Sequence, residues 1–435
     1  MKLFGTMEIN SEGHLEIGGC DSVSLASEYG TPLYIVDEKN IRNRCRIYKE
    51  SFTSESLQTE VIYASKAFLN IAMCKLIANE GLSLDVVSGG ELYTAIKADF
   101  PRQKIYFHGN NKLESELYMA VENNVGRIII DNVNEFKVLS TITKNIGAKV
   151  EVLLRVNPGI EAYTHEYIST TKSDSKFGES IFADGIYDFI KEINDDPNIS
   201  FKGLHSHIGS QIFEEGSFLE QATVMLKFIK SLNNKIGVQV NELNLGGGFG
   251  IYYTESDDPI DLPSFFERLL SEIDEQSNLL GIIPPKVLIE PGRSIVANAG
   301  TTLYKVGSTK TTYSGKNYVF VDGSMADNIR PALYGAKHEF CLANRMNDKA
   351  EKDFAITGKC CESGDILGKS FKLAKPNRGD LVAVSSTGAY NYSMASNYNR
   401  LTKPAVVFVK DGKAKIVVRR ETYEDIIKND VDIEG

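Results

Sequence analysis

Short apolar runs alternate with stretches of helical periodicity between about residues 60 and 300. Eight runs have the length and composition of buried strands, at residues 61–64, 84–87, 105–108, 127–131, 149–156, 201–208, 240–245 and 286–289. Amphipathic segments such as residues 112–124, 134–145 and 217–234 separate them. Strands that alternate with helices in this way predict a (β/α)8 barrel, and a doubly wound open sheet is the competing arrangement.

The pattern changes after about residue 300, where strand-like runs follow one another with turns between them. Asp411-Gly412 lies between two such runs and predicts a tight hairpin. The first 30 residues also have the pattern of strands and turns. We therefore predict an N-terminal β segment (1–35) that joins the C-terminal domain, a barrel (36–300), and a second, mostly antiparallel β domain (301–435).

Composition narrows the class of protein. The 435 residues are 42% hydrophobic and 24% charged, which is typical of a globular chain with a full core. A net charge of −10 argues against a nucleic-acid partner. No apolar run reaches membrane-spanning length, and the N-terminus lacks the apolar core of a signal peptide. Six scattered cysteines fit a reducing compartment, so we expect a cytoplasmic protein with no membrane partner.

Lys66 stands at the carboxyl end of the first predicted barrel strand, separated from it by Ser65. In barrels of this class the carboxyl ends of the strands form the catalytic face. We expect a lysine held there to be partly desolvated, which favours the neutral amine that forms Schiff bases. The alternative is a lysine whose aliphatic stem lies over the rim of the barrel.

His205 and His207 are two residues apart on the sixth predicted strand, so their side chains share a face. Some barrel hydrolases hold zinc with such a pair, but no cysteine spacing supports a zinc site here. A buried, hydrogen-bonded histidine is the structural alternative, particularly for His205. We therefore predict no bound metal.

Glycines and a carboxylate follow the last two barrel strands. Gly246-Gly247-Gly248 comes after the seventh, and Glu290-Pro291-Gly292-Arg293 after the eighth. Barrels commonly bind phosphate here through backbone N–H groups, although glycines after a strand are also ordinary turn residues. Arg293 offers a charge-assisted contact to an anion. Glu290 either forms a salt bridge with Arg293 or pairs with the pyridinium nitrogen of a cofactor.

The predicted β domain carries three further candidate motifs. Cys361-Glu362 places a thiol beside a carboxylate, and Arg330 and Tyr334 are four residues apart, as a surface pair or a carboxylate clamp would be. Tyr390 follows a predicted strand, where a packed aromatic residue is the ordinary interpretation. No G-x-S-x-G or C-x-x-C motif is present, so a serine hydrolase or a thiol redox protein has no support.

Together these motifs resemble the fold-type III pyridoxal-phosphate decarboxylases, and among them the diaminopimelate decarboxylases. Seven segments have the matching order and spacing: Tyr63-Ala64-Ser65-Lys66-Ala67 and residues 205–211, 246–248, 290–293, 330–334, 361–365 and 388–390. Residues 107–112 and the segment 155–159, which leads to 174–178, resemble that family too. Ser324 and the pair Lys359-Cys360 depart from its pattern near the loop that carries Cys361.

The resemblance implies that pyridoxal 5'-phosphate is the cofactor. Lys66 would bind it covalently, His207 would stack on its ring, and Glu290 would keep the ring nitrogen protonated. The phosphate would be bound by Ser210, Gly248 and the backbone of Gly292-Arg293, with Tyr390 nearby.

The resemblance also implies a small amino-acid substrate. Its far carboxylate would be held by Arg293, Arg330 and Tyr334, with Tyr390 as a further contact. Glu362 would bind the far ammonium group, and Cys361 would return a proton to carbon. In the family Cys361 and Glu362 come from the neighbouring subunit, which implies a homodimer with shared active sites.

The implied reaction is decarboxylation of meso-2,6-diaminopimelate to L-lysine, the last step of lysine biosynthesis. Ornithine-type relatives carry Asp-Gly where Glu362-Ser363 stands, which favours diaminopimelate. The alternatives are a decarboxylase of another diamino acid (ornithine, lysine or arginine type), a racemase on the same barrel, a silent homologue and a metal-dependent hydrolase.

Overall fold

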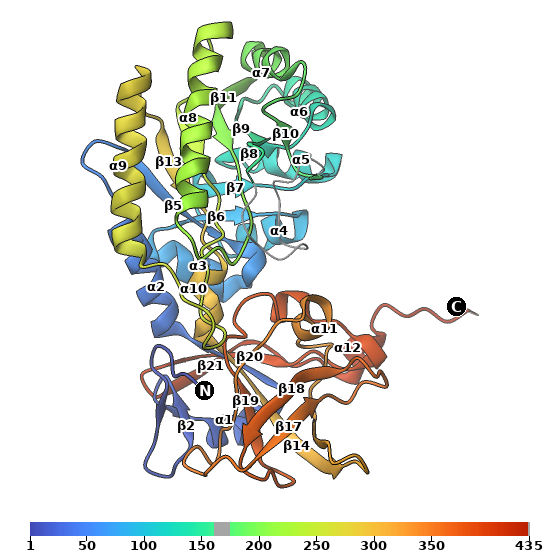
Figure 1. The fold of residues 1–435 in the computed structure, drawn as a ribbon. Coiled ribbons are helices and arrows are strands. Elements are labelled where there is room, and N and C mark those ends of the chain that lie inside the picture. The colour runs from blue at the N-terminus through green and yellow to red at the C-terminus, as the bar shows by residue number, and fades with distance from the viewer. Residues whose placement is uncertain (161–174, 434–435) are drawn as a thin grey trace. The chain divides into compact units, whose positions relative to one another are not determined.

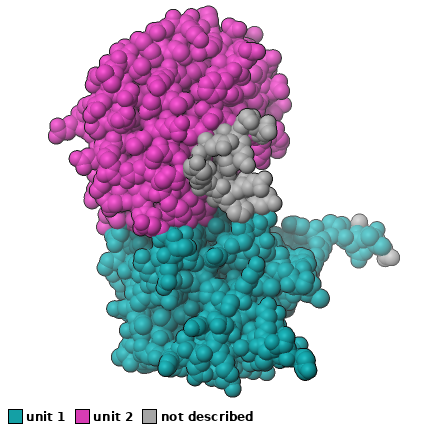
Figure 2. Space-filling model, in the orientation of Figure 1, with its two compact units in different colours: residues 1–43, 251–257, 295–435 teal, residues 44–250, 258–294 magenta. Residues whose placement is uncertain are grey.

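The computed structural model describes residues 1–160 and 175–433. The chain folds into two compact units, each discontinuous in sequence (Figure 2). Unit 1 comprises residues 1–43, 251–257 and 295–435, and unit 2 comprises residues 44–250 and 258–294.

Unit 2 contains a closed barrel of parallel strands (Figure 1). Its strands are β5 (Thr59–Ala64), β6 (Ser83–Val86), β7 (Ile105–Phe107), β8 (Arg127–Ile130), β9 (Val150–Asn157), β11 (Ile199–His205), β12 (Glu242–Asn244) and β13 (Lys286–Ile289). Every predicted barrel strand is therefore present. The doubly wound alternative is wrong, because β13 pairs with β5 and the sheet closes. The two-residue strand β10 (Glu179–Ser180) pairs with β9.

Helices follow the barrel strands. They are α2 (Glu38–Ser51), which enters unit 2 before β5, then α3 (Ile71–Glu80), α4 (Gly89–Lys97), α5 (Glu114–Glu122), α6 (Val133–Ile146), α7 (Ile186–Asp195), α8 (Gly216–Ile236), α9 (Leu262–Leu280) and α10 (Arg293–Val296). Local signals set their limits: Asn70 accepts the Met73 N–H before α3, and Gly81 ends that helix at φ 80°.

The alternation of side chains along the barrel strands determines which polar residues face the inside of the barrel. Ile62, Tyr106 and Leu288 belong to a buried apolar cluster within it. Side chains two residues apart along a strand share a face. Continuing this alternation past Tyr106 and Leu288 directs His108 and Glu290 inward at the carboxyl end of the barrel.

Unit 1 is built on a large, mostly antiparallel sheet. Its strands are β4 (Leu33–Asp37), β14 (Gly300–Thr311), β15 (Asn317–Val321), β16 (Phe340–Leu342), β17 (Lys352–Thr357), β18 (Ile366–Leu373), β19 (Leu381–Val384), β20 (Ala405–Lys410) and β21 (Lys413–Val418). The predicted hairpin is confirmed: β20 and β21 pair antiparallel around Asp411 and Gly412, both at positive φ. Two short helices, α11 (Arg330–Tyr334) and α12 (Tyr423–Ile427), complete the unit.

The N-terminal segment differs in part from the expected β pattern. Strands β1 (Glu8–Ile9), β2 (Leu15–Ile17) and β3 (Cys20–Asp21) form a small sheet of their own. Residues Ser22–Tyr29 form helix α1, because the Asp21 carboxylate accepts two N–H groups and caps it. Strand β4 is the N-terminal element that enters the large sheet, between β14 and β20. Over the described residues, no helix has the length and apolar character needed to cross a membrane.

Candidate active site

Lys66 lies just beyond β5, on a single 3₁₀ turn (Ser65–Ala67). The Glu91 carboxylate holds this turn by accepting hydrogen bonds from the Ser65 hydroxyl (2.8 Å) and the Val87 N–H (2.7 Å). The Lys66 side chain is exposed, which corrects our expectation of partial desolvation. The reason is its place on the turn, past the last buried layer of the strand.

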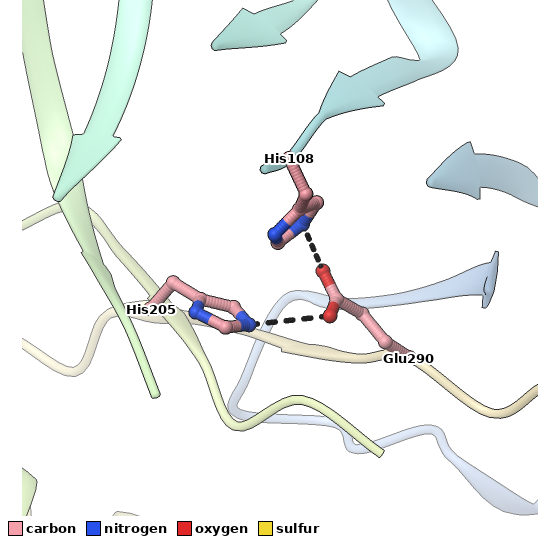
Figure 3. Close-up of side chains that lie close together, drawn as sticks. All are labelled: His108, His205 and Glu290. Carbon is pink, nitrogen blue, oxygen red and sulfur yellow. Dashed lines mark hydrogen bonds and ion pairs between the residues drawn. The ribbon is translucent and has the colours of Figure 1, made fainter. Parts of the chain in front are cut away.

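Glu290 lies at the centre of the polar end of the barrel and is 7% exposed. Its Oε1 accepts a hydrogen bond from His108 Nε2 (2.8 Å), and its Oε2 lies 3.2 Å from His205 Nε2 (Figure 3). Oε1 also accepts from Asn244 Nδ2 at 2.7 Å. These partners, rather than the alternative Arg293, hold the carboxylate. Because an ionised carboxylate only accepts hydrogen bonds, both imidazoles present Nε2–H to it.

The surroundings keep Glu290 ionised. Burial by itself raises the pKa of the carboxyl group, but the contacts with His108 and His205 outweigh burial and hold that pKa well below its usual range. Burial lowers the pKa of His205 to about 4, so this ring is neutral at physiological pH. His205 is thus the buried, hydrogen-bonded histidine that we considered as its structural alternative.

His207 has a different environment from His205. Its Nδ1 accepts the Gly247 N–H at 3.3 Å, which fixes the ring plane. Burial and then the positive charge of Lys66 hold the pKa of His207 well below its usual value, so the ring is neutral. The two histidines bond different partners, because His205 contacts Glu290 and His207 accepts the Gly247 N–H. A neutral, oriented imidazole is suited to stacking on an aromatic ring.

The loops after β11, β12 and β13 approach one another as only glycine permits. Gly248 has φ 121°, and a Cβ there would lie 2.5 Å from the Gly209 carbonyl oxygen. A Cβ on Gly292 would lie 2.9 Å from Ala64 Cβ. Arg293 is 8% exposed and donates to the Ser210 hydroxyl from Nη2 at 3.0 Å. Main chain, hydroxyl and guanidinium together suit a phosphate group.

Three residues at this end of the barrel had no predicted role. His108 and Asn244 bond Glu290, and Asp85 on β6 is 2% exposed. Burial raises the pKa of Asp85 to about 7. All three stand at or just after the carboxyl end of a barrel strand, and that position was the signal from which they could have been found.

In unit 1, the predicted substrate residues Arg330 and Tyr334 lie on helix α11. Arg330 is 6% exposed and donates from Nη1 to the Tyr253 hydroxyl at 2.7 Å. Tyr334 is half-buried, one helical turn later. Tyr253 had no predicted role, and nothing in its local sequence pointed to one.

Cys361 and Glu362 are both exposed on the loop between β17 and β18. The Cys361 N–H donates to Asn399 Oδ1 at 2.7 Å. Asp365, 3% exposed, fixes the base of the loop by accepting the N–H groups of Cys360 (2.8 Å) and Met325 (2.7 Å). The loop is therefore ordered while its thiol and carboxylate remain accessible.

Tyr390 follows β19 and is half-buried. Its φ of 61° lies in the left-handed region, which is unusual for a bulky side chain and is enriched at functional sites. This conformation adds a reason, absent from the sequence, to treat Tyr390 as more than a packed aromatic.

The structure sorts the predicted residues into two sets. Those proposed for the cofactor lie at the carboxyl end of one barrel in unit 2: Lys66, His207, Ser210, Gly248, Glu290, Gly292 and Arg293. The remaining residues lie in unit 1: Arg330, Tyr334, Cys361, Glu362 and Tyr390.

Comparisons with known proteins agree with this geometry. Residues 38–297 match the family described as pyridoxal-dependent decarboxylase, pyridoxal binding domain. Diaminopimelate decarboxylase of Bacillus subtilis is 49% identical over 99% of this chain and 98% of its own length. The enzyme of the same name from Bacillus methanolicus is 48% identical over 97% and 98%.

Solved structures agree as well. Diaminopimelate decarboxylase of M. jannaschii in co-complex with L-lysine superposes with a TM-score of 0.92 at 33% identity, over 99% of this chain and 98% of that one. The chain therefore belongs to the pyridoxal-dependent decarboxylase family and, within it, to the diaminopimelate decarboxylases.

Proposed function

We propose that this protein decarboxylates meso-2,6-diaminopimelate to L-lysine and carbon dioxide. It is a carboxy-lyase that depends on pyridoxal 5'-phosphate. The observation that carries the proposal is an ionised carboxylate, that of Glu290, at the end of a barrel whose loops also present glycine backbone and the Arg293 guanidinium. That combination fits a pyridine nitrogen and a phosphate at once.

The bound cofactor supplies an electron sink for the charge left on carbon as carbon dioxide departs. Lys66 would provide the amine that binds the aldehyde of the cofactor, from an ordered turn. Glu290 would keep the ring nitrogen protonated, because its carboxylate is held as an anion by His108, Asn244 and His205.

The substrate has two amino-acid heads, and the non-reacting head carries one carboxylate and one ammonium. We assign the carboxylate to Arg293, Arg330 and Tyr334, and the ammonium to Glu362. Tyr390 completes the contacts. A substrate such as ornithine lacks the second carboxylate, so an arginine clamp gives selectivity for diaminopimelate.

We assign to Cys361 the return of a proton to the carbon that has lost carbon dioxide. Its thiol is exposed on an ordered loop, as a proton donor to a bound substrate must be. We further propose that Cys361 and Glu362 act in the active site of a second subunit, so that the working form is a homodimer. Six free cysteines favour a cytoplasmic location for this dimer.

The test combines an absorbance scan, before and after borohydride, with carbon dioxide release from meso-diaminopimelate. We expect a yellow protein that reduction bleaches irreversibly and that is active on this substrate. Lys66→Ala should lose the bleachable absorbance. A yellow protein that prefers ornithine or lysine would overturn the substrate, and one that stays colourless with added cofactor would overturn the proposal.

A further inference from the structure

The segment that follows the glycine-rich loop of the barrel belongs, by its contacts, to unit 1. Residues 251–257 leave the barrel after Gly250 and precede α9. Asn298 donates to the Tyr252 carbonyl at 2.8 Å. The Asp257 carboxylate accepts the N–H groups of Tyr253 (2.9 Å) and Thr254 (2.8 Å), which closes a tight turn. The segment is therefore held firmly within unit 1.

Tyr253 uses this rigid support to hold Arg330. Its hydroxyl accepts the 2.7 Å hydrogen bond from Arg330 Nη1, and the guanidinium carbon lies 5.0 Å from its ring centroid. Both side chains are buried, at 7% and 6% exposure. The contact thus combines a charge-assisted hydrogen bond with a cation–π interaction, away from solvent.

His338 supports the Tyr253 ring in turn. The two rings meet edge to face, with centroids 5.3 Å apart at 89°. His338 is fully buried, and its Nδ1 lies 3.0 Å from the Ser385 carbonyl oxygen, so Nδ1 carries the hydrogen. Ser385 directly follows strand β19 of the large sheet. A chain of contacts therefore runs from that sheet through His338 and Tyr253 to Arg330.

We infer that Tyr253 is a positioning residue that orients Arg330 for the carboxylate of the substrate's non-reacting head. This rests on the role assigned to Arg330 under the proposed function. An arginine grips a carboxylate through two parallel N–H groups, so the plane of the guanidinium must be set before binding. Tyr253 sets that plane, and with it the preference for ligands that keep the carboxylate.

The segment that holds Arg330 is continuous in sequence with the glycine-rich loop of the barrel. The glycines proposed for the cofactor phosphate, at 246–250, run directly into the segment that holds Arg330. One continuous stretch of 12 residues, 246–257, thus serves the cofactor at its first half and substrate selectivity at its second. A change at Tyr253 therefore affects substrate preference through Arg330.

The test compares two inhibitors of the holoenzyme. L-Lysine retains the carboxylate of the non-reacting head, whereas cadaverine lacks it. In Tyr253→Phe we expect the inhibition constant of L-lysine to rise about 10-fold, with that of cadaverine unchanged, because the hydrogen bond to the Arg330 guanidinium is lost. The KM for diaminopimelate should rise by a similar factor, and kcat should stay within about twofold.

Tyr252→Phe is the matched control. It removes the neighbouring hydroxyl, which donates to Glu339 Oε1 at 3.1 Å instead of contacting Arg330. In this variant we expect no change in the ratio of the inhibition constants of L-lysine and cadaverine. Should Tyr253→Phe fail to fold, His338→Phe keeps an aromatic contact while removing the bond to Ser385. It should raise the ratio of the two inhibition constants, L-lysine over cadaverine, by a smaller factor than Tyr253→Phe.

Arg330→Ala distinguishes the role of Arg330 as a carboxylate clamp from the role of Tyr253 in positioning it. It should abolish the preference for L-lysine, and Tyr253→Phe should then have no additional effect on the ratio. If Arg330→Ala abolishes the preference but Tyr253→Phe leaves it intact, the positioning role is overturned and the proposed function stands. If Arg330→Ala itself leaves the ratio unchanged, the clamp assigned to Arg330 is wrong, and the role of Tyr253 falls with it.

Discussion

At the scale of single residues, the decisive arrangement is the set of donors around Glu290. They come from three different strand ends: His108 follows β7, His205 ends β11 and Asn244 ends β12. A buried carboxylate is stable as an anion only when such donors replace water. The barrel thus maintains a fixed negative charge at the carboxyl ends of its strands, where a ligand would bind.

Glu290→Gln tests that charge. The amide removes it while keeping the shape, so the ring nitrogen of the cofactor loses its ionic partner. We expect kcat to fall by about 10²–10³-fold, the range for removing one preorganised electrostatic contact. The absorbance of the bound cofactor should also shift. Asp85→Asn is the comparison, because Asp85 is a second buried acid of the same barrel and interacts electrostatically with Glu290. An equal loss there would mean that the effect does not belong to Glu290 alone.

The neutral histidines of the barrel make its stability depend on pH. The pKa of His205 falls from 6.5 to about 4 on folding, so between these values the unfolded chain binds a proton that the native chain does not. Stability therefore decreases as pH falls from 6.5 towards 4, by up to ~3 kcal/mol for this residue. His207 acts in the same direction.

Urea unfolding of the protein at several pH values between 6.5 and 4.5 measures this slope. His205→Gln keeps an N–H donor for Glu290 but cannot titrate, so its unfolding free energy should depend less on pH in this window. A variant with the same slope as the unaltered protein would show that other groups dominate.

At the scale of elements, glycines decide how closely the strand-end loops approach one another. Gly248→Ala forces a side chain into positive φ and against the Gly209 carbonyl. We expect about 10- to 100-fold weaker cofactor binding, from roughly 1–3 kcal/mol of backbone strain. Gly216→Ala, at the start of α8, meets nothing within 4 Å and is the control. Titration of the apoprotein with cofactor measures both, and equal affinities would argue against a tight loop contact at Gly248.

The sequence predicted most elements, for identifiable reasons. The barrel strands are largely buried and therefore appear as short, mostly apolar runs, although β9 and β11 carry charged residues such as Glu151 and Lys202. Strand β18, by contrast, is exposed over Lys369–Ser370, so its composition resembles that of a loop. Helix α1 was missed because its start depends on the Asp21 cap rather than on a strong apolar face.

The candidate site was predictable where chemistry is tied to a strand end, as at Lys66 and Glu290. Tyr253 could not be found this way, because its role depends on a contact with Arg330, 77 residues away in sequence. His108 and Asn244 could have been found from their positions at strand ends, but their contact with Glu290 on another strand could not. Contacts between distant segments are what one sequence does not reveal.

At the scale of the whole molecule, the residues divide by unit in a way that bears on assembly. The residues proposed for the cofactor lie in unit 2, whereas Cys361 and Glu362 stand exposed on a hairpin loop of unit 1. A loop that is ordered from within but accessible at its tip can serve either its own chain or a second copy. Symmetric dimers with isologous contacts create two equivalent sites from such an exchange.

Mixed dimers distinguish these two possibilities. Lys66→Ala and Cys361→Ala each disable both sites of a homodimer. If sites are shared between subunits, a mixed dimer has one site with both residues intact and one with neither. Random pairing makes half of the dimers mixed, so co-expressing the two variants should restore about a quarter of the unaltered activity.

Pairing Lys66→Ala with His207→Ala is the control for this experiment. Both residues belong to the same barrel, so each site of a mixed dimer keeps one defect and activity should stay low. Recovery with Cys361→Ala but not with His207→Ala would place the thiol on the opposite subunit. If neither pair recovers activity while the dimers form normally, Cys361 acts in the active site of its own chain, and the proposal of shared sites is overturned.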